Sequence, residues 1–383
     1  MKYALIFDSF WSNNSIAYLC TMNGITPIHI FSSRNAVDNA LGRQSVAYNY
    51  FLKSLVFESI DQLMHDLQEY DIEFVFGCSD VSQPIVHDIN LLLKKHVNPD
   101  FLDERDNKFN LYKMLGQPAS QNNFLEFIKT HGKSIIKPSP MGQSGGLNGV
   151  TVVDGNTVIS DLPNAYISKF FEGEEYAIDI VSCEGEHKLV AVWKYVKRHH
   201  SDCFRSKMEL IKFEDHDELI SGMYQAVNNW LDLLNYQFGP TSTEVKFDGN
   251  SFFCIEINFR LHGHMTYNAW GLALYHTQPD LTFACYANSK LFNELTMNQY
   301  QSKGYISKLY CVNHKTRLDS EIPWSTILSS QSVVKVWKHS RNDELLQPKI
   351  ANSLTDCLAI MILFNESKEQ LCIDETNVLK LFD

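Results

Sequence analysis

The first hundred residues alternate short apolar runs with segments of helical periodicity. The pattern predicts strands at 3–8, 26–31 and 72–77 and helices at 14–23, 59–70 and 84–96. Strands that alternate with helices form a parallel sheet with right-handed crossovers. We therefore expect residues 1–100 to form a small open α/β domain. Its ligand-facing edge would contain the carboxyl ends of the strands, at Asp8 to Asn13 and Cys78 to Asp80.

The segment at 256–264, EINFRLHGH, has a polar side and an apolar side if it is a strand. Alternate side chains of a strand point to opposite faces, so Glu256, Asn258 and Arg260 share one face. The residues between them are apolar. A carboxylate, a carboxamide and a guanidinium therefore stand together on a strand whose other side is built for burial.

A hairpin signal, Asp-Gly-Asn at 248–250, lies just upstream of this segment. If the loop has three residues, Asp248 pairs with Phe252, and counting back along both strands brings Glu244 opposite Glu256. Two carboxylates that face each other repel unless a cation lies between them.

Hard oxygen ligands of this kind suit Mg2+, which keeps several waters and bridges to phosphates. We predict that Glu244, Glu256 and Asn258 hold a metal ion and that Arg260 binds an anion nearby. The alternative is a solvated polar face, which the strongly apolar neighbours disfavour.

Residues 134–150, SIIKPSPMGQSGGLNGV, predict a strand, a glycine-rich loop and a second strand. The first strand delivers Lys137, and the loop includes Gly145 and Gly146. Glycines let backbone N–H groups approach an anion closely, and a lysine beside them supplies charge. The lysine precedes the glycines, which is the reverse of the Walker A order. The loop could bind phosphate, or it could be a flexible surface hairpin with an incidental lysine.

The run at 165–179, AYISKFFEGEEYAID, predicts two strands joined by an acidic glycine turn. A glutamate near such a turn could hold ribose hydroxyls while the strand backbone meets an adenine. Taken by itself, the EGEE sequence is more often a solvated turn.

The composition is that of an ordinary globular protein, with 44% hydrophobic and 20% charged residues among 383. A chain of this length predicts about two to four domain-sized units. The net charge of -12 argues against a nucleic acid as the main partner, because such binding depends on Lys and Arg. Nine scattered cysteines without a CxxC pair indicate neither a disulfide framework nor a zinc ribbon. With a strand at the start and no long apolar segment, we expect a cytoplasmic protein without a membrane partner.

Five features occur in a characteristic order: Lys108, Lys137, the glycine-rich loop, the acidic turn and the hairpin at 239–260. In this order they resemble the ATP-grasp carboxylate-amine ligases, and among these the L-amino-acid ligases that make dipeptides. The resemblance covers most of the chain. It implies α/β and α+β architecture, with an ATP-grasp fold between a small Rossmann-like domain and a C-terminal lid domain. The implied units are an N-terminal domain at 1–100, ATP-grasp subdomains at 101–170 and 171–310, and the lid at 311–383.

The resemblance also implies roles for individual residues. The metal ligands would be Glu244, Glu256 and Asn258, and the catalytic candidates are Arg260, Lys137 and His262. The implied ATP-binding residues are Lys108, Lys137, Ser139, Gly145, Gly146, Lys169, Phe171 and Glu175. Within this set, Lys169 and Phe171 match the adenine hinge and Glu175 the ribose carboxylate. The expected cofactors are ATP and Mg2+, with Mn2+ as a substitute that the same ligands would accept.

Four positions depart from the family pattern. In G-P-x-H-x-E, Ser242 stands where a His is usual. In E-I-N-P-R-x-G-G, Phe259 replaces Pro and His262 replaces a Gly, and Ser168 stands where related ligases often have Glu. ATP and metal positions are kept while pocket positions vary, so the resemblance supports the reaction more firmly than the substrates.

The implied reaction transfers a phosphoryl group from ATP to a substrate carboxylate, and an amine then attacks the acyl phosphate. Such catalysis needs positioning and charge neutralisation more than a protein nucleophile. Lys108 and Lys137 would hold the α- and β-phosphates, and Arg260 has the planar fork for a carboxylate or acyl phosphate. The incoming ammonium needs a base, and the sequence leaves open His262, His264, His199, His200 or a phosphate oxygen.

The expected partners are small molecules, either two amino acids or a related carboxylate and amine, and a homodimer stays open. One alternative is a ligase that joins a non-amino-acid carboxylate to an amine. A zinc hydrolase built on the four histidines explains neither the lysine and glycine loop nor the opposed carboxylates. A catalytically silent nucleotide-binding protein is disfavoured by the retained Lys137, Glu256 and Asn258.

Overall fold

The computed structural model organises the described chain into three sheets. It describes residues 1–9, 14–43, 48–98, 108–138, 150–157, 162, 164–197, 206–263, 267–295, 298–312, 321–338 and 357–382. The predictions that lie outside the described residues concern Ser139, Gly145, Gly146, His199, His200 and His264.

The N-terminal domain is an open parallel sheet with the strand order β3-β2-β1-β4, as predicted. Its elements are β1 (Lys2–Phe7), α1 (Asn14–Met22), β2 (Ile25–Phe31), α2 (Arg34–Arg43), a 3-10 turn (Tyr48–Tyr50), β3 (Ser54–Val56), α3 (Ile60–Asp66), β4 (Asp71–Gly77) and α4 (Gln83–Leu93). The sequence pattern did not predict α2 or β3. Helix α2 has few apolar residues, and β3 is too short to show a periodicity.

A small antiparallel sheet follows, with the strand order β5-β8-β6-β7. Its elements are α6 (Lys108–Met114), β5 (Ala119–Ser120), α7 (Phe124–His131), β6 (Ser134–Pro138), β7 (Thr151–Val153) and β8 (Ala165–Lys169). Ile136 and Ile167 share an apolar cluster with α7. Because side chains alternate along a strand, the neighbouring pair Lys137 and Tyr166 points to the opposite face.

The large sheet has the strand order β13-β12-β9-β10-β11-β14-β16-β15. Its strands are β9 (Glu174–Cys183), β10 (Glu186–Val196), β11 (Lys207–Leu210), β12 (Gly239–Phe247), β13 (Phe252–Asn258), β14 (Tyr305–Val312), β15 (Val333–Lys338) and β16 (Cys357–Asn365). The helices in this part are a 3-10 turn (Phe213–Asp215), α8 (Asp217–Leu233), α9 (Tyr267–Ala273), α10 (Gln278–Ala287), α11 (Ser289–Glu294), α12 (Trp324–Leu328) and α13 (Lys368–Leu379).

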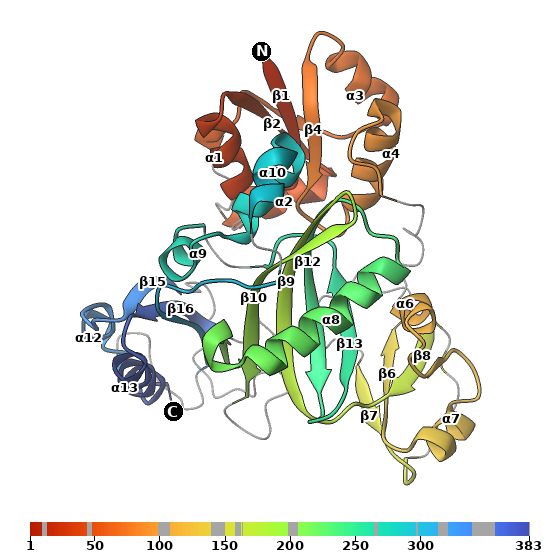
Figure 1. Ribbon diagram of the computed structural model, residues 1–383, viewed down its shortest axis with the longest axis vertical. Coiled ribbons are helices and arrows are strands. Elements are labelled where there is room, and N and C mark those ends of the chain that lie inside the picture. The colour runs from red at the N-terminus through yellow and green to blue at the C-terminus, as the bar shows by residue number, and fades with distance from the viewer. Residues whose placement is uncertain are drawn as a thin grey trace.

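Helix α8 lies across one face of the large sheet (Figure 1). The ring of Phe252 lies against Gly222 of this helix. Phe252 pairs with Phe247, so both point toward α8. Glu244 is three residues from Phe247 and therefore points to the other face, which is the face turned away from α8.

The C-terminal strands extend the large sheet. The predicted domain boundary at 310/311 falls inside β14, and β14, β15 and β16 pair with one another as part of that sheet. Helix α10 packs between the N-terminal domain and the large sheet, beside α1 (Figure 1). The division into four units stays a prediction. Within the described residues, no helix has the length and apolar character needed to cross a bilayer.

Candidate functional site

Glu244 and Glu256 face each other across β12 and β13, as the sequence predicted. The path to this register differs from the prediction. The turn is longer by one residue, so that Phe247 rather than Asp248 pairs with Phe252. A bulge at the Glu244 end of the ladder then restores the count. The longer turn and the bulge each shift the pairing by one residue, in opposite directions. Glu244 and Glu256 therefore still lie opposite each other.

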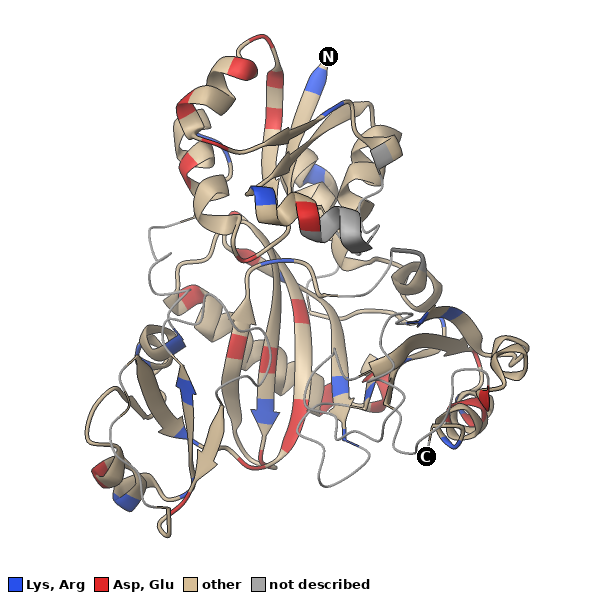
Figure 2. Cartoon of the chain, turned by 180° about the vertical axis from the view of Figure 1, so that it is seen from behind, with Lys and Arg blue, Asp and Glu red and all other residues tan. Residues whose placement is uncertain are grey.

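On the face of the large sheet that is turned away from α8, side chains form rows across β9, β12 and β13. The first, second and third rows are Glu175, Lys246 and Phe253; Ala177, Glu244 and Glu256; and Asp179, Ser242 and Asn258. Successive rows are two residues apart along β9 and β12, which is about 6.6 Å, whereas the bulge places Phe253 and Glu256 of β13 three residues apart. Figure 2 shows acidic and basic residues together on the central strands of this sheet.

A lysine lies against the second row. Lys108 Nζ is 2.9 Å from Glu256 Oε2. Burial would raise the pKa of Glu256, but Lys108, with Arg260 and Lys137, outweighs it and holds this pKa below the ordinary carboxyl value. The cation that the opposed carboxylates require is therefore a lysine in this structure.

Lys137 is buried, and its partner is a phenol. Its Nζ donates to Tyr112 Oη at 2.8 Å, and Tyr112 donates in turn to the Ile255 carbonyl at 2.9 Å. Burial lowers the pKa of Lys137, while nearby carboxylates, above all Glu256, oppose that shift. Tyr112 was not predicted from the sequence, although its spacing of four residues from Lys108 places both on one side of α6.

The residues near Lys137 fit a bound nucleotide and metal. Tyr166 Oη and Ser168 Oγ lie on the same face as Lys137, and both are buried without a hydrogen-bond partner among the described residues. Buried polar groups are normally paired, so these two atoms suit the polar groups of a ligand. The two carboxylates and the Asn258 carboxamide form a hard oxygen donor set that suits Mg2+.

The predicted adenine hinge contains a stacked aromatic pair. Phe171 stacks on Phe253 of the first row, with ring centroids 4.0 Å apart and planes inclined by 12°. Lys169, at the end of β8, is exposed and has its Nζ 5.9 Å from the Phe171 ring centroid. The stacked rings therefore form an apolar surface at the position where the sequence predicted that the adenine would pack.

The predicted ribose carboxylate also belongs to the first row. Lys246 Nζ lies 3.5 Å from Glu175 Oε2 and donates to the Gly173 carbonyl at 3.2 Å. Gly173 has φ +113, and a Cβ there would lie 2.1 Å from the Phe247 carbonyl oxygen. Only glycine fits this position, so the turn that presents Glu175 depends on it.

Arg260 lies just beyond the end of β13 and contacts the N-terminal domain. Its Nε lies 3.1 and 3.2 Å from the two carboxylate oxygens of Asp80, and its Nη2 donates to Asn258 Oδ1 at 3.1 Å. In this structure the guanidinium therefore binds a carboxylate of the protein itself.

The predicted edge of the N-terminal sheet is partly occupied by its own hydrogen bonds. Asp8 is buried in a left-handed conformation, with φ +50. Its carboxylate accepts from the Ser32 N–H at 2.9 Å and from the Ser79 hydroxyl at 2.6 Å. Asp8 thus holds the ends of three strands together.

His262 is the described member of the four histidines that the sequence left open as bases. It is buried, and its Nδ1 lies 2.9 Å from Asp179 Oδ1 and 3.2 Å from Ser242 Oγ. Trp193 Nε1 donates to the other oxygen of Asp179 at 2.6 Å. Two departures from the family pattern, Ser242 and His262, are therefore in contact. Asp179 and Trp193 were not predicted, because they read as ordinary strand residues until the register places Asp179 beside Ser242 and Trp193 opposite Ala177.

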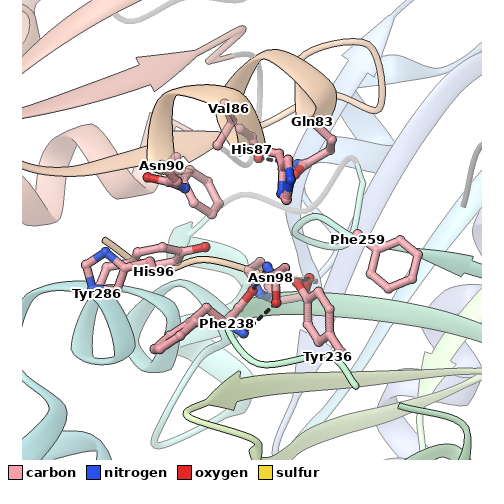
Figure 3. Close-up of a pocket in the computed structure, with 13 residues that line it drawn as sticks. Gln83, Val86, His87, Asn90, His96, Asn98, Tyr236, Phe238, Phe259 and Tyr286 are labelled. Atoms are coloured by element: carbon pink, nitrogen blue, oxygen red, sulfur yellow. Dashed lines mark hydrogen bonds between the residues drawn. The ribbon is translucent and has the colours of Figure 1, made fainter. Parts of the chain in front are cut away.

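A small cavity lies where α4 meets the segment at 236–240 (Figure 3). The residues labelled around it are Gln83, Val86, His87, Asn90, His96, Asn98, Tyr236, Phe238, Phe259 and Tyr286. Its volume of about 20 Å³ holds about one water molecule and is too small for an amino acid or a nucleotide. None of the described residues that line it is Lys, Arg, Asp or Glu. The cavity therefore belongs to the junction between domains.

The metal-binding prediction involves two carboxylates and an amide. Among the described residues, no group of three or more His, Cys, Asp and Glu side chains could hold a metal ion. The zinc alternative needed three histidines that lie outside the described part of the chain. Within it, the Nδ1 of His262 is committed to Asp179 and Ser242.

Comparison with known proteins shows similarity in structure. No family model matches the sequence, and no curated protein matches it. The structure of L-amino acid ligase from Bacillus licheniformis matches with a TM-score of 0.75 and 13% identity, over 100% of this chain and 97% of that one. N5-carboxyaminoimidazole ribonucleotide synthetase from Thermotoga maritima matches with a TM-score of 0.66 and 12% identity, over 99% and 98% of the two chains. Phosphoribosylglycinamide synthetase from Anaerococcus prevotii matches with a TM-score of 0.65 and 11% identity, over 100% and 98%.

These solved structures are ATP-grasp ligases, and they match along their whole length. The chain has the ATP-grasp fold. The predicted fold class is therefore confirmed.

Proposed function

We propose that the protein is an ATP-dependent ligase that forms an amide bond between two L-amino acids, with release of ADP and phosphate. The observation that carries this proposal is the opposed pair Glu244 and Glu256, with Lys108 and Lys137 beside it. Two carboxylates and two lysines at one point suit a phosphate chain with its metal ion better than they suit a structural core.

Different residues of the chain bind different parts of ATP. Lys108 and Lys137 hold the α- and β-phosphates, exchanging Glu256 and Tyr112 for phosphate oxygens. Phe171 and Lys169 pack against the adenine, and Glu175 accepts hydrogen bonds from the ribose hydroxyls. Glu244, Glu256 and Asn258 hold Mg2+, which when bound neutralises phosphate charge.

Arg260 orients the substrate carboxylate that accepts the phosphoryl group. A guanidinium offers two parallel donors to a carboxylate, and it already holds one from Asp80. Phosphorylation of the substrate turns a poor electrophile into an acyl phosphate with a good leaving group. The amine then attacks the acyl carbon, and phosphate departs.

The assignment of amino acids as substrates rests on the resemblance of the sequence and on the structural similarity to the L-amino acid ligase from Bacillus licheniformis. A ligase for a non-amino-acid carboxylate and an amine would use the same ATP and metal residues.

A matrix of amino-acid pairs tests the proposal. Each pair is incubated with ATP and Mg2+, and released phosphate and product mass are measured together. We expect phosphate release that requires both substrates, with a product of dipeptide mass. Release with a non-amino-acid carboxylate alone would select the alternative, and the absence of any ATP-dependent condensation would overturn the proposal.

A further inference from the structure

We propose that His262 accepts the proton of the incoming ammonium and that Asp179 positions its imidazole for this role. The inference rests on the proposed ligase function and assigns the base that the sequence leaves open. His262 is the catalytic residue of this pair, and Asp179 is a positioning residue.

The side-chain contacts of Asp179 hold the imidazole of His262 in a defined orientation. Its side chain is fully buried, and each of its oxygens has a partner, Trp193 Nε1 at 2.6 Å and His262 Nδ1 at 2.9 Å. A buried carboxylate is costly unless it is paired in this way. The pairing holds the imidazole at one end and leaves Asp179 no oxygen without a donor.

This contact also selects the tautomer of His262. A carboxylate oxygen is an acceptor, so Nδ1 carries the proton and donates to Asp179. In this tautomer Nε2 is the ring nitrogen that accepts a proton. The backbone N–H of His262 donates to Gln278 Oε1 at 2.8 Å, which fixes the chain at this residue to α10.

The register of β9, β12 and β13 places Asp179 and His262 relative to the proposed ATP and metal residues. Asp179, Ser242 and Asn258 lie directly across from one another, and Ser242 Oγ is 3.2 Å from His262 Nδ1. The third row is one step, about 6.6 Å, beyond the opposed carboxylates and on the side away from Glu175. If the first row holds the ribose, and the second row together with Asn258 holds the metal and phosphates, the Asp179 end of the third row lies where the second substrate must arrive.

The proton and electron balance of the step is complete. The ammonium gives one proton to Nε2 of His262, and the freed lone pair forms the C–N bond at the acyl carbon. The bond between the acyl carbon and the oxygen that bridges to phosphorus breaks, and the phosphate leaves with that electron pair and takes the second proton of the amine. The products are the amide, hydrogen phosphate and an imidazolium whose charge the Asp179 carboxylate balances.

The test compares two acceptors with the same acyl donor. An amino acid arrives as an ammonium and needs a base, whereas hydroxylamine is already neutral near neutral pH and reacts with acyl phosphates to give hydroxamates. We expect His262→Gln to lower amide formation with an amino acid by about 10² or more. The same variant should form hydroxamate at nearly the wild-type rate, with an unchanged KM for ATP.

Asp179→Asn gives an independent variant, because an amide in place of the carboxylate no longer enforces the Nδ1–H tautomer. We expect the same split between the two acceptors, and this variant carries the test if His262→Gln does not fold. The matched control is His187→Gln. His187 is also buried on the large sheet, with its Nδ1 2.7 Å from Ser182 Oγ and its Nε2 3.4 Å from Asp232. Its loss should affect stability and leave the acceptor preference unchanged.

The outcomes separate this inference from the proposed function. Equal loss with both acceptors in His262→Gln and Asp179→Asn would make the pair structural, and loss with neither would place the base elsewhere. Either result overturns the inference while the wild type remains a ligase. If the wild type forms neither amide nor hydroxamate with any carboxylate, the proposed function itself fails.

Discussion

Lys137 is a buried ammonium whose direct partner is neutral. Its hydrogen bond goes to the Tyr112 hydroxyl, and the carboxylates that favour its charge act from further away. A buried cation without a direct anionic partner is costly to the folded state. Such a residue is expected where an anionic ligand completes the pairing, which is the role proposed for this lysine.

The first prediction concerns Lys137→Met, which keeps the apolar stem and removes the charge. We expect ATP affinity to fall by about tenfold to a hundredfold, because a charged hydrogen bond is lost. The free energy of unfolding should stay the same or rise, since a buried charge is removed. Calorimetric titration with ATP and thermal unfolding measure the two effects.

Lys129→Met is the matched control for this substitution, because Lys129 is exposed on α7. It should leave both the ATP affinity and the free energy of unfolding unchanged. Unaltered ATP affinity in Lys137→Met would remove this strand from the nucleotide site.

The second prediction concerns the pKa of Glu256, which the structure holds below the ordinary value of 4.5. A carboxyl whose pKa is lower in the folded state stabilises the fold above the unfolded-state pKa. That stability is lost as the pH falls through the folded-state pKa. We therefore expect the free energy of unfolding of the wild type, without Mg2+, to fall as the pH drops below about 4.5. Glu256→Gln should lose less over the same range.

Urea unfolding of both proteins between about pH 7 and about pH 3 measures this difference. Identical pH dependence of the two proteins would mean that the pair with Lys108 does not persist in solution. Glu126→Gln, at an exposed carboxylate on α7, should follow the wild type.

Single residues differ in how far the sequence alone identifies them. The side-chain alternation of a strand was enough to place Glu256 and Asn258 on one face, because that period is a local property. Tyr112 and Asp179 carry no such signal. Their importance arises from contacts with Lys137 and His262, which are distant in sequence, so it appears only once the strands are placed in register.

At the scale of elements, β13 is an edge strand whose irregular part is held by side chains from α6 and from the segment that follows it. Tyr112 donates to the Ile255 carbonyl at 2.9 Å, and Gln117 donates to the Cys254 carbonyl at 3.2 Å. Edge strands expose backbone groups that need partners. These bonds connect the bulge, and with it the position of Glu256, to α6.

The third prediction compares Tyr112→Phe with Tyr224→Phe. Each substitution removes a hydroxyl that donates to a backbone carbonyl, since Tyr224 donates to His187. Each should lower the free energy of unfolding by about 1 kcal/mol. Only Tyr112→Phe should also weaken ATP binding, because it removes the bond that holds the bulge and with it the position of Glu256. Equal ATP affinities in the two variants would show that the hydroxyl does not position the site.

The elements themselves were largely predictable, whereas their register was not. Apolar runs and hairpin residues indicate strands and turns locally, and the predicted strands of the N-terminal domain are present. A bulge is a choice between two nearly equivalent pairings, which depends on partners such as Tyr112 from another element. The turn at Asp248 was therefore predicted with the wrong length although the carboxylates were predicted opposite each other.

At the scale of the whole molecule, polar contacts join the N-terminal domain to the large sheet near the site. Asp80 binds Arg260, and the side chain of Asn98 bonds to the backbone of Gln237 and Phe238. Arg260 therefore has two interpretations: it ties two domains together, or it binds a substrate carboxylate once one arrives.

The fourth prediction separates these interpretations. Arg260→Lys should keep ATP binding and lose amide formation by about 10² or more, because lysine cannot reproduce the planar fork. Asp80→Asn weakens the same contact between domains from the other side and should cost less than about tenfold. Similar losses in both variants, measured as rates of amide formation at saturating ATP, would make Arg260 a structural link.

In the proposed reaction, the substrate carboxylate is phosphorylated before the amide bond forms. The most direct measurement uses an acyl donor whose carboxylate oxygens are labelled with oxygen-18, and follows the label into the products by mass spectrometry. We predict that each amide formed transfers one labelled oxygen to the inorganic phosphate, because the acyl phosphate breaks at the carbon–oxygen bond. Unlabelled phosphate, or label recovered in AMP, would contradict the account.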